Sequence, residues 1–431
     1  MKLLVLGSGG REHALVWRLA RDADVRGVVC APGNPGMAAL APCRPVDLAA
    51  PDEVLALAAA ERVDLTVVGP EAPLERGLAD VFRRAGRAIV GPDRQGAALE
   101  CSKVFAKGFM AEQDIPTARF VVCDGPDRAR AVVAGGELGL PVVVKADGLA
   151  AGKGVVIAAT PADAEAAIDL MMVDRRFGGA GARVVLEECL TGPEVSCFVL
   201  CDGDRGLLLG TAQDHKRIWD DDRGPNTGGM GAFAPSPLWT DELADLVQRR
   251  IVQPALAGMR AKGVPYRGFL YVSLMLTREG PRVIEFNVRL GDPEAQVVLP
   301  LIDGGLAAAL SSSAEGDLAG RTLVAGARRY VGVVMASRGY PGSAESGRAI
   351  HGLESVADSD DVLVFHAGTA RAADGQLVTA GGRVLTVVGA GDTYERAMTT
   401  AYRAVDAIHF DGMQFRRDIG RKAAASGSVQ V

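Results

Sequence analysis

The first hundred residues alternate short apolar runs with segments of helical periodicity. The apolar runs occupy Leu3–Gly7, Gly27–Cys30, Leu65–Gly69 and Ala88–Gly91, and helical patterns fill Arg11–Arg21, Pro51–Glu61 and Ala72–Ala85. This βαβα order predicts a doubly wound parallel sheet, in which ligands bind at the carboxyl ends of the strands. Glycine turns follow three of the strands, so we expect them to meet at one edge: Gly7–Gly10, Gly33–Gly36 and Gly69–Glu71.

Length and composition restrict the class of protein further. At roughly 100–200 residues per domain, a chain of 431 residues predicts two to four domains. The net charge of −6 argues against a nucleic-acid partner, and no stretch reaches the roughly 18 apolar residues of a membrane span. Seven scattered cysteines without a Cys-x-x-Cys pair argue against a disulfide scaffold or zinc and indicate a reducing cytoplasm. We therefore expect a cytoplasmic protein without nucleic-acid or membrane partners.

The later patterns divide the chain into further α/β units. We expect an N-terminal domain over 1–101, a connecting helix and linker over 102–122, and units over 123–188, 189–326 and 327–431. A long helix is expected around Asp241–Lys262, with a kink at Pro254, and the tail beyond Gly420 is expected to fray. Strands are expected at Pro141–Asp147, Val155–Thr160, Arg183–Cys189, Gly268–Leu276, Arg282–Val288, Tyr330–Ala336, Val362–Phe365 and Arg383–Val388.

The turn after the first strand, Gly7-Ser8-Gly9-Gly10-Arg11-Glu12-His13, is suited to binding phosphate. Its backbone N–H groups lie at a helix N-terminus, and glycine lets a ligand approach closely. The dinucleotide spacing G-x-G-x-x-G is absent because position 12 is glutamate, and no acidic residue follows the second strand. A phosphorylated sugar is therefore favoured over NAD, and a tight turn without a ligand is the alternative.

Lysine is rare in this chain and is concentrated in one region. Eight of the 47 basic residues are lysine, and five of them lie at positions 103, 107, 145, 153 and 216. A strand delivers Lys145 and the glycine-rich turn Gly148–Gly154 delivers Lys153, so two amines can meet a polyphosphate beneath a closing loop. The P-loop spacing is absent. The alternative is a plain hairpin with solvated lysines.

Two more segments combine groups of different chemistry. Alternation along Glu285-Phe286-Asn287-Val288-Arg289 places the two oxygen donors and the arginine on one strand face. A carboxylate with an amide oxygen suits Mg²⁺, and the arginine suits a transferring phosphoryl group; a solvated strand face is the alternative. The charged run Gln213–Ile218 and the glycine-rich run Gly224–Gly231 together predict a substrate loop.

Together these segments resemble the phosphoribosylamine–glycine ligases, also called glycinamide ribonucleotide synthetases, which are ATP-grasp enzymes. The resemblance runs from Gly7 to Gly420, and its most specific motif is Arg289-Leu290-Gly291-Asp292-Pro293-Glu294-Ala295-Gln296. It implies an α/β multidomain protein with an N-terminal doubly wound parallel sheet that binds a sugar phosphate. An ATP-grasp core of two α+β subdomains would follow, with 123–188 as lid and 189–326 as core, and then a small C-terminal α/β domain.

The resemblance also implies a reaction. ATP, glycine and 5-phosphoribosylamine would give glycinamide ribonucleotide, ADP and phosphate through a glycyl phosphate, in the second step of purine biosynthesis. A labile acyl phosphate needs a lid that excludes water, and its formation needs a metal-bridged triphosphate with cationic clamps. The resemblance implies ATP and Mg²⁺ or Mn²⁺ as cofactors, small-molecule substrates as partners, and a monomer.

Individual roles follow from the resemblance by position. The nucleotide would contact Lys103, Lys145, Gly152, Lys153, Gly154, Glu187, Glu188 and Glu194. Glu285 and Asn287 would hold the metal. Substrate binding would use Gly9, Gly10, Arg11, Glu12, Asn34, Gly36, Glu71, Lys216, Asn226, Thr227 and Gly228. The catalytic candidates are Arg289, Asp214 and Asp292, with the glycine side formed by these three.

Some positions depart from the family pattern, and rival functions stay open. Val272-Ser273 stands where Ala-Gly is commoner, Leu290 where Phe is commoner, and Cys101 where Gly is commoner; we interpret these as packing differences. The rivals are an ATP-grasp ligase for another acid or amine, a nucleotide- or sugar-phosphate-binding regulator without catalysis, and an NAD dehydrogenase. A complete set of phosphate and metal ligands argues against the regulator.

Overall fold

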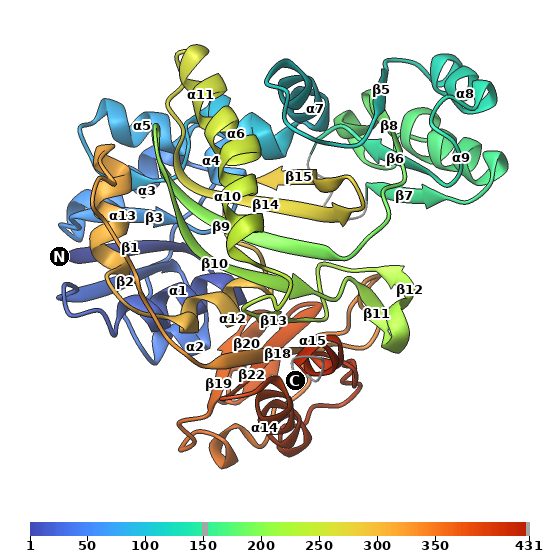
Figure 1. Ribbon diagram of the computed structural model, residues 1–431. Helices are drawn as coiled ribbons and strands as arrows, with labels where there is room; N and C mark the ends of the chain where they lie inside the picture. The colour runs from blue at the N-terminus through green and yellow to red at the C-terminus, as the bar shows by residue number, and fades with distance from the viewer. Residues whose placement is uncertain (149–153, 428–431) are drawn as a thin grey trace.

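A computed structural model describes residues 1–148 and 154–427, and three larger sheets organise them (Figure 1). The first is a parallel sheet of order β2-β1-β3-β4, as the βαβα pattern predicts. The expected helix over 72–85 is two helices, because Gly77 between them adopts a left-handed φ of 80°. The elements are β1 (Lys2–Gly7), α1 (Gly10–Leu19), β2 (Gly27–Pro32), α2 (Pro35–Ala38), α3 (Pro51–Ala60), β3 (Leu65–Val68), α4 (Ala72–Glu75), α5 (Leu78–Arg84) and β4 (Ile89–Val90).

The second sheet is small and antiparallel, with order β5-β8-β6-β7. Helices α6 (Arg94–Cys101) and α7 (Lys103–Glu112) lead into it, and α8 and α9 cover it at the edge of the molecule (Figure 1). The expected antiparallel pairing of the two strands is confirmed as β6 and β7, while positions 149–153 of the glycine-rich turn lie outside the described residues. The elements are β5 (Phe120–Cys123), α8 (Pro126–Gly135), β6 (Val142–Ala146), β7 (Val155–Ala158), α9 (Pro161–Ile168) and β8 (Val184–Glu188).

The third sheet has eight antiparallel strands in the order β15-β14-β9-β10-β13-β18-β22-β19. The C-terminal strands do not form a separate sheet: β13 pairs with β10 on one side and β18 on the other, so they extend the central strands. The strands are β9 (Glu194–Asp202), β10 (Gly206–Asp214), β13 (Gly231–Ala234), β14 (Arg267–Thr277), β15 (Gly280–Asn287), β18 (Arg329–Ala336), β19 (Val362–His366) and β22 (Arg383–Gly391).

Shorter elements decorate this sheet. A hairpin of β11 (Arg217–Trp219) and β12 (Arg223–Asn226) leaves it between β10 and β13, and the other two-stranded pairs are β16 (Ile302–Gly304) with β17 (Val324–Ala325) and β20 (Thr369–Arg371) with β21 (Leu377–Thr379). The helices are α10 (Asp241–Val247), α11 (Gln253–Ala261), α12 (Ala295–Val298), α13 (Leu306–Glu315), α14 (Tyr394–Ala407) and α15 (Arg421–Gly427).

Two local expectations have different outcomes. The long helix over 241–262 is interrupted by a π-helical turn, Gln248–Val252, just before Pro254, whose ring nitrogen has no hydrogen to donate to the preceding turn. The prediction of a frayed tail beyond Gly420 is wrong as far as Gly427, because α15 continues the chain and buries Ala423 against the C-terminal core. The apolar run within the tail is too short to indicate that helix.

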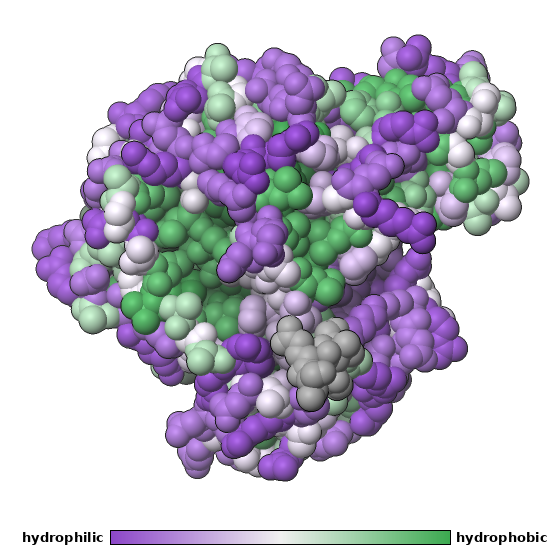
Figure 2. Space-filling model, viewed as in Figure 1, coloured by the Kyte–Doolittle hydropathy of each residue, from purple (hydrophilic) through white to green (hydrophobic). Residues whose placement is uncertain are grey.

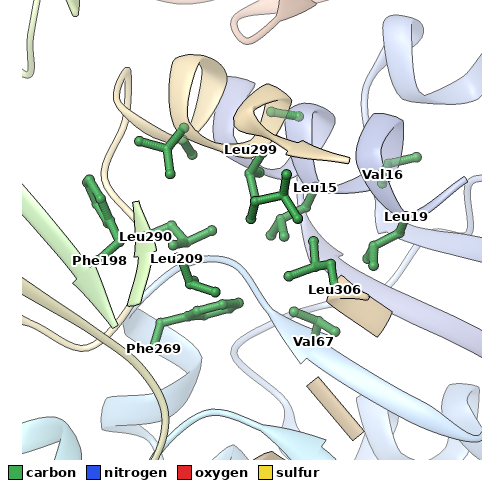
Figure 3. Close-up of a cluster of buried hydrophobic side chains, with 14 of the residues drawn as sticks. Leu15, Val16, Leu19, Val67, Phe198, Leu209, Phe269, Leu290, Leu299 and Leu306 are labelled. Carbon is green, nitrogen blue, oxygen red and sulfur yellow. The ribbon is translucent and has the colours of Figure 1, made fainter. Parts of the chain in front are cut away.

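One hydrophobic core joins the N-terminal sheet to the eight-stranded sheet (Figure 3). Leu15 and Leu19 of α1 share this cluster with side chains on strands β9, β10 and β14 of the eight-stranded sheet, namely Phe198, Leu209 and Phe269. Leu299 and Leu306, which come after β15 in the chain, belong to the same cluster. Burial of such side chains contributes about 1.5–3 kcal/mol each. Loops of the two sheets are therefore held at fixed positions relative to each other.

The outer surface is mostly hydrophilic. Figure 2 shows polar side chains over much of this face, hydrophobic side chains gathered nearer its centre, and a mixture of the two over the unit of the small sheet. Within the part of the chain that the structure describes, no helix is long and apolar enough to cross a membrane.

Candidate active site

A cleft of about 520 Å³ is lined by strands of the small sheet and of the eight-stranded sheet, and by Arg11 and Glu71, which follow strands of the N-terminal sheet. Seventeen of the residues singled out from the sequence line it: Arg11, Glu71, Lys103, Lys145, Gly154, Glu187, Glu188, Glu194, Asp214, Lys216, Asn226, Thr227, Gly228, Glu285, Asn287, Arg289 and Asp292. Five others, Gly9, Gly10, Glu12, Asn34 and Gly36, do not line it. Gly152 and Lys153 lie outside the described residues. The sequence therefore identified most of the polar side chains that line this cleft.

Two buried lysines share one carboxylate at the inner end of the cleft. Lys107 Nζ lies 2.9 Å and Lys145 Nζ 3.0 Å from Glu187 Oε2. Lys145 and Glu187 face the same side because β6 and β8 pair in antiparallel register. Burial lowers the pKa of Lys107 to about 8, although Glu187 opposes this shift. Glu187 Oε1 is buried and accepts no hydrogen bond, so a ligand can supply a donor there.

Helix α7 places Lys107 by its own capping. Ser102 accepts from the Phe105 N–H at 3.1 Å and donates to Asp147 Oδ1 at 2.9 Å, which ties the helix start to the end of β6. Lys107 lies one turn further along and also donates to Thr117 Oγ1 at 2.7 Å. Lys103, nearer the helix start, donates to the Gly148 carbonyl at 3.2 Å. The helix thus directs two lysines toward one cleft.

Glu285 and Asn287 lie on one face at the end of β15, as the alternation predicts. Burial would raise the pKa of Glu285, but neighbouring cations lower it, Lys216 and Lys145 most strongly. Asn287 Oδ1 accepts from Arg289 at 3.2 Å, while Asn287 Nδ2 is buried without a partner. Within the described ranges, no group of three or more His, Cys, Asp or Glu side chains could hold a metal. A metal here would need oxygen ligands from elsewhere, such as phosphate.

Arg289 is the most heavily paired cation of the cleft. Its guanidinium lies 2.7 Å from Glu100 Oε1 and 3.2 Å from Glu71 Oε2, and it donates to the Leu290 carbonyl at 3.2 Å. Burial would lower the pKa of Arg289, but Glu100 and Glu71 raise it above its usual value. Burial raises the pKa of Glu100 to about 7, against the influence of Arg289. Arg289 therefore carries a permanent positive charge beside Asn287.

A group of carboxylates surrounds Lys216 at the other end of the cleft. Burial raises the pKa of Asp214 to about 7; Lys216 opposes this shift, and Glu294 and Glu194 add to it. Lys216 pairs with Glu194 at 2.5 Å. Glu294 Oε1 accepts from the Tyr271 hydroxyl at 3.1 Å. This end can bind a cationic group and exchange a proton near neutral pH.

Asp292 connects the N-terminal sheet to the C-terminal strands. Gln296 donates to Asp292 Oδ1 at 2.8 Å, and Arg383 lies 3.4 Å from Oδ2. Burial would raise the pKa of Asp292, but Arg383 and Arg11 lower it. A Cβ on Gly9 would lie 3.6 Å from Asp292 Oδ2, so the first glycine turn reaches this carboxylate.

The predicted cradle residues outside the cleft make contacts within the protein. Glu12 caps α1 by accepting from the Gly9 N–H and from Arg11 Nε, both at 2.7 Å. Asn34 caps α2 and donates to the Ser8 and His366 carbonyls at 2.9 and 2.8 Å. A Cβ on Gly36 would lie 2.3 Å from His13 Cε1. The glycine turns meet at one edge as expected, and these side chains hold that edge together.

The site roles assigned from the sequence left out several residues that line the cleft: Lys107, Glu100, Tyr271, Glu294 and Arg383. Lys107 stands out in a lysine-poor chain and follows Lys103 by four positions on one helix, which was a usable signal. Glu294 lies in the most specific motif. Nothing local distinguishes Glu100, Tyr271 or Arg383, since tertiary packing alone brings them to the cleft.

Comparison with known proteins gives consistent matches over nearly the whole chain. Three family models match: "Phosphoribosylglycinamide synthetase, N domain" over residues 1–100, its ATP-grasp (A) domain over 101–295 and its C domain over 330–422. Phosphoribosylamine–glycine ligase of Ralstonia nicotianae is 48% identical, covering 98% of this chain and 99% of that protein. The Xanthomonas axonopodis pv. citri ligase is 50% identical over 99% of this chain and 98% of that protein.

Solved structures agree. The phosphoribosylamine–glycine ligase of Thermotoga maritima superposes with a TM-score of 0.84 at 35% identity, covering 97% of this chain and all of that chain (100%). The biotin carboxylase domain of Hydrogenobacter thermophilus 2-oxoglutarate carboxylase, solved with MgADP, has a TM-score of 0.71 at 17% identity, covering 96% of this chain and 91% of that chain. The second match shows a shared fold.

Proposed function

The chain belongs to the phosphoribosylglycinamide synthetase family, and on that premise we propose how its cleft carries out the family's reaction. The reaction is the ATP-dependent ligation of glycine to 5-phosphoribosylamine, which gives glycinamide ribonucleotide, ADP and phosphate in purine biosynthesis. The glycine carboxylate accepts the γ-phosphoryl group, and the amine of phosphoribosylamine then displaces phosphate. Each step develops charge at a different end of the cleft.

Lys107 and Lys145 bind the nucleotide phosphates. Their ammonium groups lie within 3.0 Å of Glu187 Oε2, so the same carboxylate keeps both at the inner end of the cleft. Glu187 Oε1 has no protein donor and suits an N–H of the nucleotide. Lys103, Gly154 and Glu188 also line the nucleotide side. Glu194 is proposed for the nucleotide too, and because it pairs with Lys216 at 2.5 Å it lies where the nucleotide side meets the glycine side.

Enzymes of the ATP-grasp fold use ATP or ADP with a divalent metal ion, and we assign Mg²⁺, with Mn²⁺ as a substitute, to Glu285 and Asn287. The fit rests on the ionised carboxylate of Glu285 and on Asn287 Oδ1, an oxygen that accepts a hydrogen bond from Arg289 at 3.2 Å. When bound, the metal supplies charge neutralisation and orientation of the phosphates. Arg289, held by Glu71 and Glu100, adds a fixed positive charge beside this pair.

The remaining residues form the glycine and amine side. Asp214, with a pKa near 7, binds the glycine ammonium or accepts a proton from the attacking amine. Asp292 and Lys216 face the same space, and Asn226, Thr227 and Gly228 form its edge. Phosphoribosylamine enters from the side of Arg11 and Glu71, with Gly9, Gly10, Glu12, Asn34 and Gly36 shaping the loops behind them.

The observation that carries this assignment is the single cleft that joins the Lys107–Glu187–Lys145 group to the Glu285–Asn287–Arg289 face. The test is ADP release with Mg²⁺-ATP, glycine and phosphoribosylamine prepared fresh from ribose 5-phosphate and ammonia. ADP that appears only when both substrates are present supports the proposal. Release that ignores glycine would indicate a different acid, and none at all would indicate a non-catalytic binder.

The localisation, the oligomeric state and the roles of the domains belong to the same proposal. The protein acts on small molecules; we propose that it is a cytoplasmic monomer without a nucleic-acid partner. Residues 1–101 hold the sugar phosphate, 102–122 connect, 123–188 close over the nucleotide, 189–326 hold metal and substrates, and 327–431 support them. Size-exclusion chromatography with light scattering tests the monomer.

A further inference from the structure

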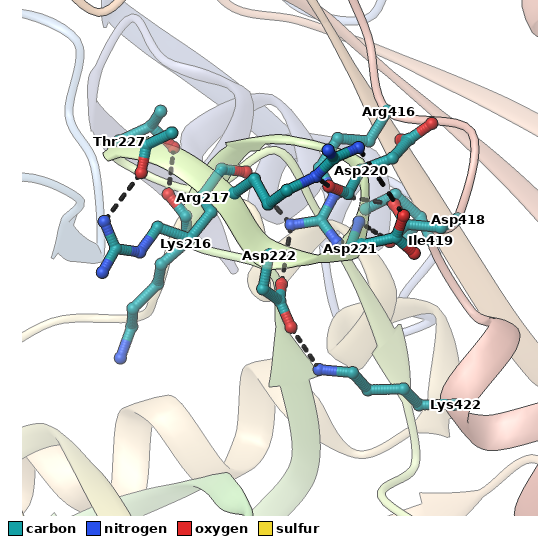
Figure 4. Close-up of polar contacts among 12 residues, drawn as sticks. Lys216, Arg217, Asp220, Asp221, Asp222, Thr227, Arg416, Asp418, Ile419 and Lys422 are labelled. Atoms are coloured by element: carbon teal, nitrogen blue, oxygen red, sulfur yellow. Dashed lines mark hydrogen bonds and ion pairs between the residues drawn. The ribbon is translucent and has the colours of Figure 1, made fainter.

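The β11–β12 hairpin carries cleft residues at its base, and residues 416–422 contact its tip (Figure 4). At the base, Thr227 donates to the Lys216 carbonyl from its N–H at 2.8 Å and from its hydroxyl at 2.9 Å. Lys216 and Asn226–Gly228 line the cleft there. A shift of the hairpin would therefore move this wall of the cleft.

The backbone at the tip of the hairpin adopts an unfavourable conformation. Asp221 and Asp222 both adopt left-handed φ values, 58° and 52°. Aspartate tolerates this region better than most residues other than glycine, but two such residues in succession still cost free energy. Contacts from outside the hairpin offset that cost.

Segment 416–422 supplies them, and each of the three tip aspartates has a partner in it. The Arg417 N–H donates to Asp220 Oδ1 at 2.7 Å, and the Asp221 N–H donates to Asp418 Oδ2 at 3.0 Å. Asp222 accepts from Arg416 Nη1 at 2.8 Å and from Lys422 at 2.6 Å. This set of four contacts spans nearly 200 positions of sequence.

Arg416 is the centre of this arrangement. Its side chain is fully buried (0% exposed), and it meets Asp418 in a two-point contact of 2.7 and 2.6 Å. It also donates to the Arg217 carbonyl on β11 at 3.1 Å. Tyr402 of α14 fixes the segment from behind, donating to the Arg416 carbonyl and accepting from the Ile419 N–H, each at 2.9 Å. Planar, two-point arginine contacts fix orientation as well as distance.

The C-terminal strands also hold the base of the hairpin. Tyr340 accepts from the Gly228 N–H at 2.8 Å, and Arg383 donates to the Gly228 carbonyl at 2.6 Å. The hairpin is thus fixed at both ends by residues beyond position 330, none of which is part of the hairpin's own fold.

We propose that the buried Arg416–Asp418 pair is a positioning device that sets the β11–β12 hairpin, and through it Lys216 and Asn226–Gly228, for the glycine and amine side of the cleft. This rests on the proposed function for the roles of those four cleft residues. The nucleotide phosphates lie at the other end, on α7, β6 and β8. Lys216 also reaches Glu194 at 2.5 Å, so the pair affects the binding of glycine or phosphoribosylamine much more strongly than the binding of ATP.

Asp222→Asn is the test variant, because its side chain is 41% exposed and its loss leaves Arg416 paired with Asp418. The control is Asp245→Asn, the same substitution in a solvent-exposed aspartate–arginine pair outside the cleft. Two readouts are compared: tryptic cleavage after the exposed Arg223, followed by mass spectrometry, and separate KM values for ATP, glycine and phosphoribosylamine. Cleavage in a native protein reports local opening.

Asparagine keeps an oxygen that can accept from Arg416 but removes the negative charge. Weakening this charge-assisted contact predicts about tenfold faster cleavage after Arg223 and about a tenfold higher KM for glycine or phosphoribosylamine. The KM for ATP and the control variant should stay within about twofold of wild type. Unchanged cleavage would overturn the proposal, as would faster cleavage with every KM unchanged, or an equal rise in the KM for ATP. If wild-type protein makes no product, the proposed function fails on its own, and cleavage alone decides whether the pair holds the hairpin.

Discussion

Replacing Lys107 with methionine separates the stability of the protein from its affinity for nucleotide. Methionine has a similar length and no charge, and the side chain it replaces is 3% exposed. Glu187 keeps Lys145 at 3.0 Å, and Thr117 still donates to the Val283 carbonyl at 2.6 Å. The variant therefore removes one buried ammonium without leaving its neighbours unpaired.

The magnitude follows from the pKa of Lys107. Burial lowers this pKa from 10.5 to about 8. Below pH 8 Lys107 is protonated in the folded protein, but it binds its proton less tightly there than in the unfolded chain. At about 1.4 kcal/mol per pKa unit, the charged lysine reduces folding stability by about 3 kcal/mol at pH 7. Lys107→Met should raise the free energy of unfolding by an amount of that order. The same change should weaken ATP binding by about tenfold or more, because a charged contact to phosphate is lost.

The assay is urea unfolding at pH 7 and at pH 8–10.5, with ATP affinity from calorimetry. Wild-type stability should rise with pH across that window, because the unfolded chain holds the lysine proton up to about pH 10.5 while the folded protein releases it near pH 8. The variant should lack that component of the slope. Lys262→Met, which breaks a lysine–glutamate pair outside the cleft, is the control. A less stable variant, or one that binds ATP as wild type does, would refute the reasoning.

Three further predictions concern the rest of the cleft. Glu285→Gln should fold normally and lose Mg²⁺-dependent ADP formation; turnover that survives, measured by a coupled ADP assay, would remove Glu285 from the metal site. Asp214, with a pKa of about 7, should give kcat/KM for glycine a limb that rises through pH 7, and Asp214→Asn should lack it in a pH–rate profile. Arg289→Met should lower the free energy of unfolding by about 3–5 kcal/mol in urea titrations, because Glu71 and Glu100 lose their buried partner; a loss below about 1 kcal/mol would contradict that.

Local patterns in the sequence were sufficient for the N-terminal sheet and for part of the cleft, and the family resemblance supplied most of the other cleft residues. Parallel strands bring their carboxyl ends to one edge, and Asn34 indeed donates to the Ser8 carbonyl at 2.9 Å across two of the glycine turns. Strand alternation likewise placed Glu285 and Asn287 together. These inferences need only the period of a strand and the direction of the chain.

Contacts between distant segments could not be predicted in the same way. Strand β13 pairs with β18 about a hundred positions later, and four-residue strands carry too little pattern to indicate a partner. The sequence also cannot distinguish a residue that binds a ligand from one that caps a helix. Glu12 and Asn34 are polar residues in glycine turns, and in the structure both accept hydrogen bonds from backbone N–H groups at the start of a helix. The turn chemistry was correct, while the direction of each side chain depended on packing.

The main cations of the cleft are already paired with carboxylates before a nucleotide binds. Lys107 and Lys145 both face Glu187, and Arg289 faces Glu71 and Glu100. A triphosphate therefore has to compete with carboxylates for its lysines, which reduces the net gain from each contact. A divalent metal at the proposed Glu285 site would add positive charge that none of these carboxylates neutralises, and it would shift that competition toward the nucleotide. Affinity for ATP should accordingly depend on the metal more strongly than affinity for ADP, because the additional phosphate brings the additional negative charge.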